Sequence, residues 1–261
     1  MLARLHCALF GLFLAAPLVA FAQASYLDAR EALAKTVRQR LLSEFIVKEY
    51  LETAVGVQRA PGELATAILV FDDQIADLKA FAGPKPELKE LVAAVEKEWQ
   101  TVRQLVSTPP DRTRASSLRL AGQRLYKAAE ANTAAFQRVA GTAPPPLAAL
   151  SDRQRLLSQR VAKNLLLISL RIDVDEARAE LGEARAEFSS GLKQLRAAPD
   201  SSIDISADLD AVDSAWEAIE AAAALERRDR EVTMRAMDAA DVILSRMERT
   251  GNLFRRLGTR K

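Results

Sequence analysis

The chain has 261 residues, with 37 lysines and arginines against 35 aspartates and glutamates, one histidine and one cysteine. The charges nearly balance and only 5% of the residues are aromatic, so the basic, aromatic-lined surface of a nucleic-acid-binding protein is missing. We therefore expect no nucleic-acid partner.

Residues 1–24 have the pattern of a secretory signal peptide. Arg4 precedes an apolar run over residues 8–22, and Ala22-Gln23-Ala24 provides the small residues of a cleavage site. The run is short for a membrane span, which needs about 20 apolar residues. We expect cleavage and secretion; an uncleaved anchor in the inner membrane is the alternative.

Cleavage after Ala24 leaves 261 − 24 = 237 residues and removes His6 and Cys7, the only histidine and cysteine. Catalytic triads, cysteine nucleophiles, disulfides and zinc, haem or iron–sulfur sites are thereby excluded. The aspartates at 72–73 and 208–213 lack the spacing of a calcium loop. We expect no enzyme, no metal and no cofactor.

The composition and periodicity predict helices throughout. Alanine, leucine, arginine and glutamate favour helix, and apolar residues recur at spacings of three and four. Asp173 and Glu176 have the spacing of a capping box at the start of one helix. Proline and glycine clusters separate the expected helices. In chain order these cover residues 26–58, 63–82, 87–107, 111–139, 147–171, 173–197, 206–223 and 227–257.

One unit of sequence occurs twice. The segment Arg38–Ser43 returns unchanged as Arg153–Ser158, an offset of 115 residues. Trp99 and Trp216 follow at an offset of 117 and Phe136 and Phe254 at 118, as short loop insertions would produce. We interpret both tryptophans as core anchors. The prediction is an all-α protein: a signal peptide (1–24) and two tandem antiparallel four-helix bundles (25–143 and 144–261).

The segment Ser151–Lys163 carries a resemblance to a known family. Its sequence, Ser-Asp-Arg-Gln-Arg-Leu-Leu-Ser-Gln-Arg-Val-Ala-Lys, resembles the first helix of the PilJ-type N-terminal domain of type IV pilus methyl-accepting chemotaxis transducers. The duplication extends the resemblance to nearly the whole mature chain. It implies a periplasmic four-helix bundle that senses or binds a small ligand. A related domain occurs in nitrate/nitrite sensor kinases, where first-helix arginines paired across a dimer axis hold the anion.

By this resemblance, the ligand-binding positions lie on the first helix of each copy. Glu44 and Phe45 replace Gln159 and Arg160 in the first copy, which weakens the case for an anion site there. Guanidinium groups suit planar oxyanions. The positions implied are Arg153, Arg155, Ser158 and Arg160 in the second copy, with Arg38, Arg40 and Ser43 in the first.

These residues also have a purely structural interpretation. The arginines can pair with acidic residues of neighbouring helices, and a helical serine often bonds back to a carbonyl one turn earlier. Lys48 and Lys163, which match at the same offset of 115, are expected at the surface or rim.

Two functional hypotheses follow. The first is a soluble periplasmic sensory or binding module that holds a small anion, nitrate-like by analogy, and acts with a membrane receptor. The second is a ligand-free interaction module that docks onto a receptor or another protein of the envelope, pilus or chemotaxis system. Two arrangements stay open: the copies replace the family's dimer internally, or the chain forms a homodimer.

Overall fold

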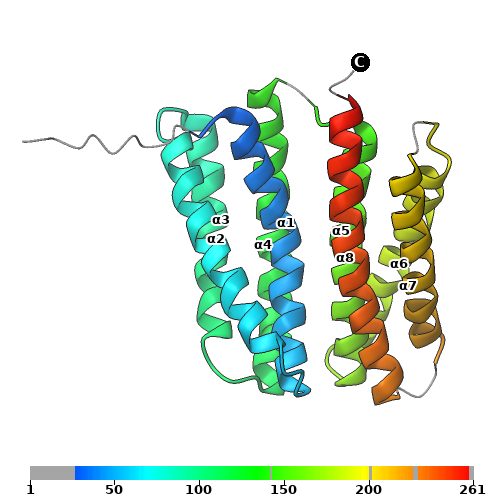
Figure 1. The fold of residues 1–261 in the computed structure, drawn as a ribbon. Helices are drawn as coiled ribbons and strands as arrows, with labels where there is room; N and C mark the ends of the chain where they lie inside the picture. Colours follow the sequence, from blue (N-terminus) through cyan, green and yellow to red (C-terminus); the bar gives the residue numbers. More distant parts are fainter. Residues whose placement is uncertain (1–26, 142, 200–201, 226–228, 259–261) are drawn as a thin grey trace, which may run out of the picture.

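The computed structural model describes residues 27–141, 143–199, 202–225 and 229–258, so the expected signal peptide lies outside them. The described residues form eight helices and no strand, which confirms the all-α fold (Figure 1). No described helix has the length and apolarity to cross a membrane. The helices are α1 (Ala29–Ala54), α2 (Ala60–Ala82), α3 (Pro86–Val106), α4 (Arg112–Ala140), α5 (Pro146–Ser169), α6 (Val174–Arg196), α7 (Ile203–Ala224) and α8 (Arg230–Gly258).

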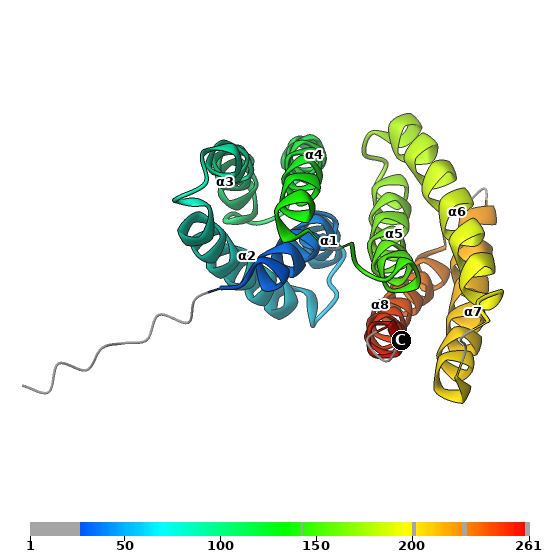
Figure 2. The ribbon, with the colours of Figure 1, turned by 90° about the horizontal axis from the view of Figure 1, so that it is seen from above.

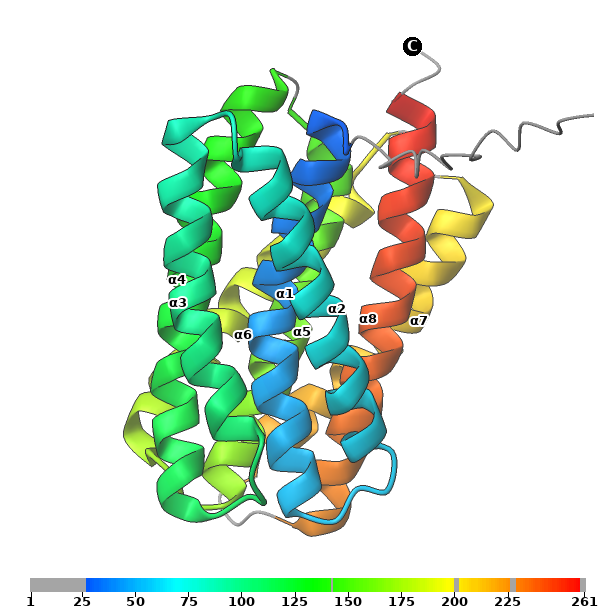
Figure 3. The ribbon, with the colours of Figure 1, turned by 90° about the vertical axis from the view of Figure 1, so that its left-hand side faces the viewer.

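The helices form two sets of four, α1–α4 and α5–α8, which lie side by side (Figure 2). Within each set the first helix packs against the second and the fourth, and the third lies across from it. The sets meet mainly where α1 packs against α5, and helices of both sets run along one common direction (Figure 3). One cluster of buried apolar residues continues through this contact. The predicted boundary at residue 143 falls in the α4–α5 linker, but it does not separate two cores.

Both sets contain the same aromatic pair. Phe71 stacks on Trp99 with ring centroids 4.2 Å apart, and Phe188 stacks on Trp216 at 4.0 Å. The tryptophans are 1% and 8% exposed, which confirms them as core anchors. Each pair joins the second and third helices of its set. The offset of 117 residues therefore relates positions that occupy equivalent places in the fold.

The closest approach of the first and fourth helices is packed differently in the two sets. In the first set a Cβ added to Gly122 would lie 2.7 Å from Cγ2 of the buried Val47. The repeat offsets place Ala240 and Ala162 at the corresponding positions of α8 and α5, and both are fully buried. A glycine–valine pair in one set thus takes the place of an alanine–alanine pair in the other, which keeps the volume nearly constant.

The predicted capping box at Asp173 is wrong. Asp173 precedes α6, but its backbone is left-handed, with φ 43°, and its side chain caps no helical N–H. Its carboxylate instead accepts hydrogen bonds from Ser116 Oγ at 2.9 Å and from Arg119 Nε at 2.6 Å, both on α4. A contact between the two sets has replaced the local one.

The packing at Gly122 predicts that the effect of Gly122→Ala on stability changes sign with the size of the residue at position 47. Gly122→Ala should lower the free energy of unfolding by about 1–2 kcal/mol, because the new methyl group overpacks against Val47. In a Val47→Ala background, where Gly122→Ala completes the alanine pair of the second set, the same change should be neutral or stabilising. Urea unfolding of the four variants measures both effects.

Gly182→Ala is the matched control, because an added Cβ there meets no atom within 4 Å. It should stabilise by about 0.5–1 kcal/mol. An equal effect of Gly122→Ala in both backgrounds would show that the contact with Val47 does not limit the packing.

Candidate functional site

The predicted ligand-binding residues gather where α1 meets α5. Both helices start at the same end of the molecule, so the repeated segments Arg38–Ser43 and Arg153–Ser158 lie in neighbouring stretches of adjacent helices (Figure 2). The two serine hydroxyls bond back to carbonyls of their own helices. Ser43 Oγ donates to the carbonyl of Arg40 at 2.7 Å, and Ser158 Oγ donates to that of Arg155 at 2.8 Å.

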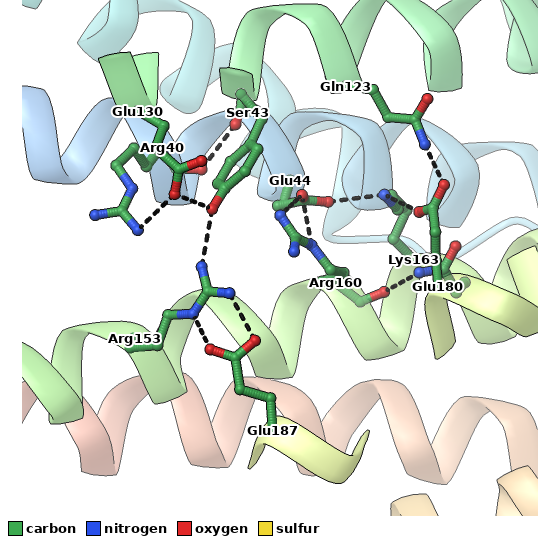
Figure 4. Close-up of polar contacts among 12 residues, drawn as sticks. Arg40, Ser43, Glu44, Gln123, Glu130, Arg153, Arg160, Lys163, Glu180 and Glu187 are labelled. Carbon is green, nitrogen blue, oxygen red and sulfur yellow. Dashed lines mark hydrogen bonds and ion pairs between the residues drawn. The ribbon is translucent and has the colours of Figure 1, made fainter. Parts of the chain in front are cut away.

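On one side of the contact Arg153 and Arg40 pair with side chains of the chain itself, although the buried Nε of Arg40 has no hydrogen-bond partner (Figure 4). Arg153 donates from Nε and Nη2 to the two oxygens of Glu187, at 2.5 and 2.6 Å, and from Nη1 to the Tyr126 hydroxyl at 2.8 Å. That hydroxyl donates to Glu130 Oε1 at 2.8 Å, which lies 3.5 Å from Arg40 Nη2. Hydrogen bonds from Arg153 lower the pKa of Glu187. We call these five residues the filled site.

Arg160 is also paired, across the boundary between the sets (Figure 4). Its Nη2 lies 2.8 Å from Oε1 of Glu44 on α1, and Lys163 Nζ lies 2.8 Å from the other oxygen. Lys163 also approaches Glu180 of α6 at 3.2 Å. Burial alone would raise the pKa of Glu44, but Lys163 and Arg160 lower it to about 2. Glu44 is therefore a buried anion that binds the second set to the first.

On the other side of the contact Arg38 and Arg155 line a hollow of about 590 Å³. It lies between α1, α5 and α8, beside the α4–α5 linker. Leu33, Val37 and Leu41 contribute apolar surface from the same face of α1 as Arg38. We refer to it as the hollow. The residues around it are Arg30, Leu33, Ala34, Val37, Arg38, Leu41, Ala143, Pro144, Pro145, Asp152, Arg155, Glu248, Asn252, Arg255 and Gly258.

The guanidinium groups of the hollow are incompletely paired. Arg155 reaches Asp152 at 3.5 Å and Glu248 at 3.3 Å, and its buried Nε has no hydrogen-bond partner. Within the described residues, Arg30 and Arg38 have no carboxylate partner. Arg30 and Arg38 are exposed, so water solvates their donors, and an anionic ligand would replace that water with a charge-assisted pair.

The repeat relates the filled site to residues around the hollow. The offsets make Arg38 the counterpart of Arg153 and Arg155 that of Arg40. Glu248 corresponds to Glu130, and its 3.3 Å contact with Arg155 repeats the contact of Arg40 with Glu130. The fillers are not repeated, since Val70 stands where Glu187 would be and Leu244 where Tyr126 would be. Arg38 therefore has no acid at the counterpart of Glu187 and no ring at the counterpart of Tyr126, although neither Val70 nor Leu244 is among the residues that line the hollow.

The predicted placement of Lys48 and Lys163 at the surface is wrong. Lys48 is fully buried and Lys163 is 2% exposed. Lys48 Nζ lies 2.6 Å from Asp241 of α8, 2.9 Å from Glu49 and 3.1 Å from Glu52. Each lysine has one carboxylate partner from the opposite set, Asp241 for Lys48 and Glu44 for Lys163, which one helix read alone cannot reveal.

The cluster around Lys48 holds more acid than base. Glu49, Glu52 and Asp241 face Lys48, and Arg59 pairs with both Asp241 and Glu52. Glu49 Oε2 is buried without a partner. Burial raises the pKa of Glu49, and the attraction of Lys48 only partly offsets it, so the value is about 7.

The residues missed by sequence reasoning are those that complete these clusters. Tyr126, Glu130 and Glu187 fill one site, and Glu44 anchors the other arginine. The sequence contained a signal for two of them. The arginines are repeated, but the counterpart of Glu187 is Val70 and the counterpart of Tyr126 is Leu244.

Comparison with known proteins agrees with the resemblance of the second copy. Residues 149–240 match the family model PilJ, described as the N-terminal domain of type IV pili methyl-accepting chemotaxis transducers. The match covers most of α5, all of α6 and α7, and the first part of α8. No curated protein and no solved structure matches the chain. The matched family relates this segment to sensory modules of chemotaxis.

The burial of Glu49 predicts a pH-dependent effect of Glu49→Gln. The raised pKa of Glu49 means that its favourable contribution is complete below about pH 4.5 and is lost as the pH rises through about 7. Glutamine stays neutral, so the variant should gain roughly 1–3 kcal/mol of stability over the wild type at pH 8 and much less at pH 5. Urea unfolding at both pH values measures this difference.

Glu90→Gln, at an exposed position of α3, provides the control for a general charge effect. The same change in stability for Glu49→Gln at pH 5 and pH 8 would contradict the assigned titration.

Proposed function

We propose that this protein is a periplasmic sensory module that binds a small anion in the hollow and reports its occupancy to a membrane signalling partner. The family match of residues 149–240 supports a sensory role related to chemotaxis. The signal-like pattern of residues 1–24 supports export.

One observation carries the ligand site. Arg38 and Arg155, two of the arginines singled out in the sequence, come from different copies and line the same hollow. Arg38 has no carboxylate partner among the described residues, and Arg155 retains an unpaired buried N–H. A ligand in the hollow would link α1 of the first set to α5 and α8 of the second. By changing how the two sets pack, it would give a signal that a partner can read.

The engagement of the other arginines supports a different role for them. Arg40, Arg153 and Arg160 are held by Glu130, Glu187 and Glu44. An anion at these positions would have to displace a carboxylate already bound in place. We assign them to holding the two sets together.

The pairing of Arg40, Arg153 and Arg160 with carboxylates of the chain also favours the second candidate function, a ligand-free interaction module. If every first-helix arginine were paired in this way, no guanidinium would remain for a ligand. The two functions therefore differ at Arg38 and Arg155 and can be separated by experiment.

Alanine substitutions should separate binding from stability. Calorimetric titration with nitrate, nitrite, acetate and benzoate should detect at least one anion, and Arg38→Ala or Arg155→Ala should weaken its binding at least about tenfold, the loss of one charge-assisted contact. Arg160→Ala should leave the affinity within about threefold. It should instead lower the free energy of unfolding by about 3 kcal/mol, because Glu44 loses one of its two cations.

No heat from any of the four anions, together with one stoichiometric protein partner recovered from an envelope extract, would overturn the ligand-binding proposal in favour of the interaction module. Equal loss of binding in all three variants would show that the hollow is not the site.

A further inference from the structure

We propose that the ligand of the hollow is an aromatic carboxylate, because the chain itself places a carboxylate and a phenol ring at the equivalent filled site. The proposal rests on the function proposed above and specifies the ligand class of the same site. The filled site serves as the template, since its two arginines and its Glu130 have counterparts in the hollow.

The acidic group follows from Glu187. In the filled site its two oxygens accept from Nε and Nη2 of Arg153, a bidentate arrangement that matches a carboxylate to a guanidinium (Figure 4). In the hollow Arg38 is the counterpart of Arg153, and Val70 replaces the acid. A ligand carboxylate on Arg38 would restore the missing pair.

The ring follows from Tyr126. Its ring lies 4.4 Å from the guanidinium carbon of Arg160 and 6.0 Å from that of Arg40, and it packs with Leu41 and Leu156 in one buried apolar cluster. A guanidinium near an aromatic face is a favourable contact. In the hollow the counterpart of Tyr126 is Leu244, which is smaller and has no ring.

The size and charge of the hollow agree with such a ligand. At about 590 Å³ it lies within the range of small-molecule sites. An inorganic oxyanion is little larger than a water molecule, which occupies roughly 30 Å³, and would leave most of the space to solvent. Four arginines against two acids leave a net positive charge around the hollow. The apolar side chains of Leu33, Val37 and Leu41 are available for the ring.

Four probes separate the contributions of charge and ring, three of them of similar size and acetate without the ring. Benzoate carries both, acetate the charge alone, benzyl alcohol the ring alone, and benzylammonium the ring with the opposite charge. Calorimetric titration of the whole mature chain should give benzoate an affinity at least about tenfold higher than that of acetate or benzyl alcohol, with no binding of benzylammonium. Arg38→Ala should weaken benzoate at least about tenfold.

Each alternative outcome has a definite meaning. Acetate or nitrate binding as tightly as benzoate, with dependence on Arg38, overturns the aromatic ligand and leaves the anion site standing. Benzyl alcohol binding as tightly as benzoate overturns the role of the carboxylate. The absence of binding by any anion overturns this inference and the proposed function together.

The repeat supplies a second test that does not depend on losing an arginine. The double variant Val70→Glu/Leu244→Tyr places the two fillers of the filled site at their counterpart positions, within reach of Arg38 if the repeat geometry holds. It should bind benzoate at least about tenfold more weakly than the wild type, with an unfolding temperature equal to or above that of the wild type. The reverse variant, Tyr126→Leu/Glu187→Val, should raise the benzoate stoichiometry from one to two.

Full benzoate affinity in the folded Val70→Glu/Leu244→Tyr variant would overturn the proposal, because the hollow would then not be the counterpart of the filled site.

Discussion

The structure depends on a buried carboxylate that belongs to one copy and is neutralised by the other. Glu44 of α1 is 5% exposed at its side chain and is held by Arg160 and Lys163 of α5. A buried charge is tolerated only with close opposite charges, so α1 cannot leave α5 without exposing or orphaning Glu44. The apolar cluster that continues through the same contact adds burial, while the ion pairs fix the register of the two helices.

Around this fixed contact the two copies have diverged in complementary ways. One pair of first-helix arginines, Arg40 and Arg153, is paired internally with carboxylates and a phenol hydroxyl. The equivalent pair, Arg155 and Arg38, lines a hollow, and the counterparts of Tyr126 and Glu187 are Leu244 and Val70. Duplication allows such a division: one site pairs its arginines across the contact of the two sets, and its counterpart is where we propose that a ligand binds.

The sequence was sufficient for the helices and for their order, because sustained apolar periodicity and proline breaks decide both. It also identified Trp99 and Trp216 as core residues. It failed where the outcome depends on a partner from the other copy. Lys48 looks like a solvated face residue until Asp241 is brought beside it, and Asp173 looks like a cap until α4 supplies Arg119. Arg38 and Arg153 begin identical segments. Only the residues opposite them, which differ between the copies, decide whether the arginine forms an ion pair or lines a hollow.

A double-mutant cycle on Glu44 and Lys163 tests the central claim most directly. Glu44→Gln, Lys163→Met and the double variant would be compared by urea unfolding of the mature chain. The account predicts that each single substitution is destabilising and that the double variant is less destabilised than their sum, with a coupling energy of about 2 kcal/mol or more. Additivity within about 0.5 kcal/mol would contradict it, because the two copies would then not be joined through this buried pair.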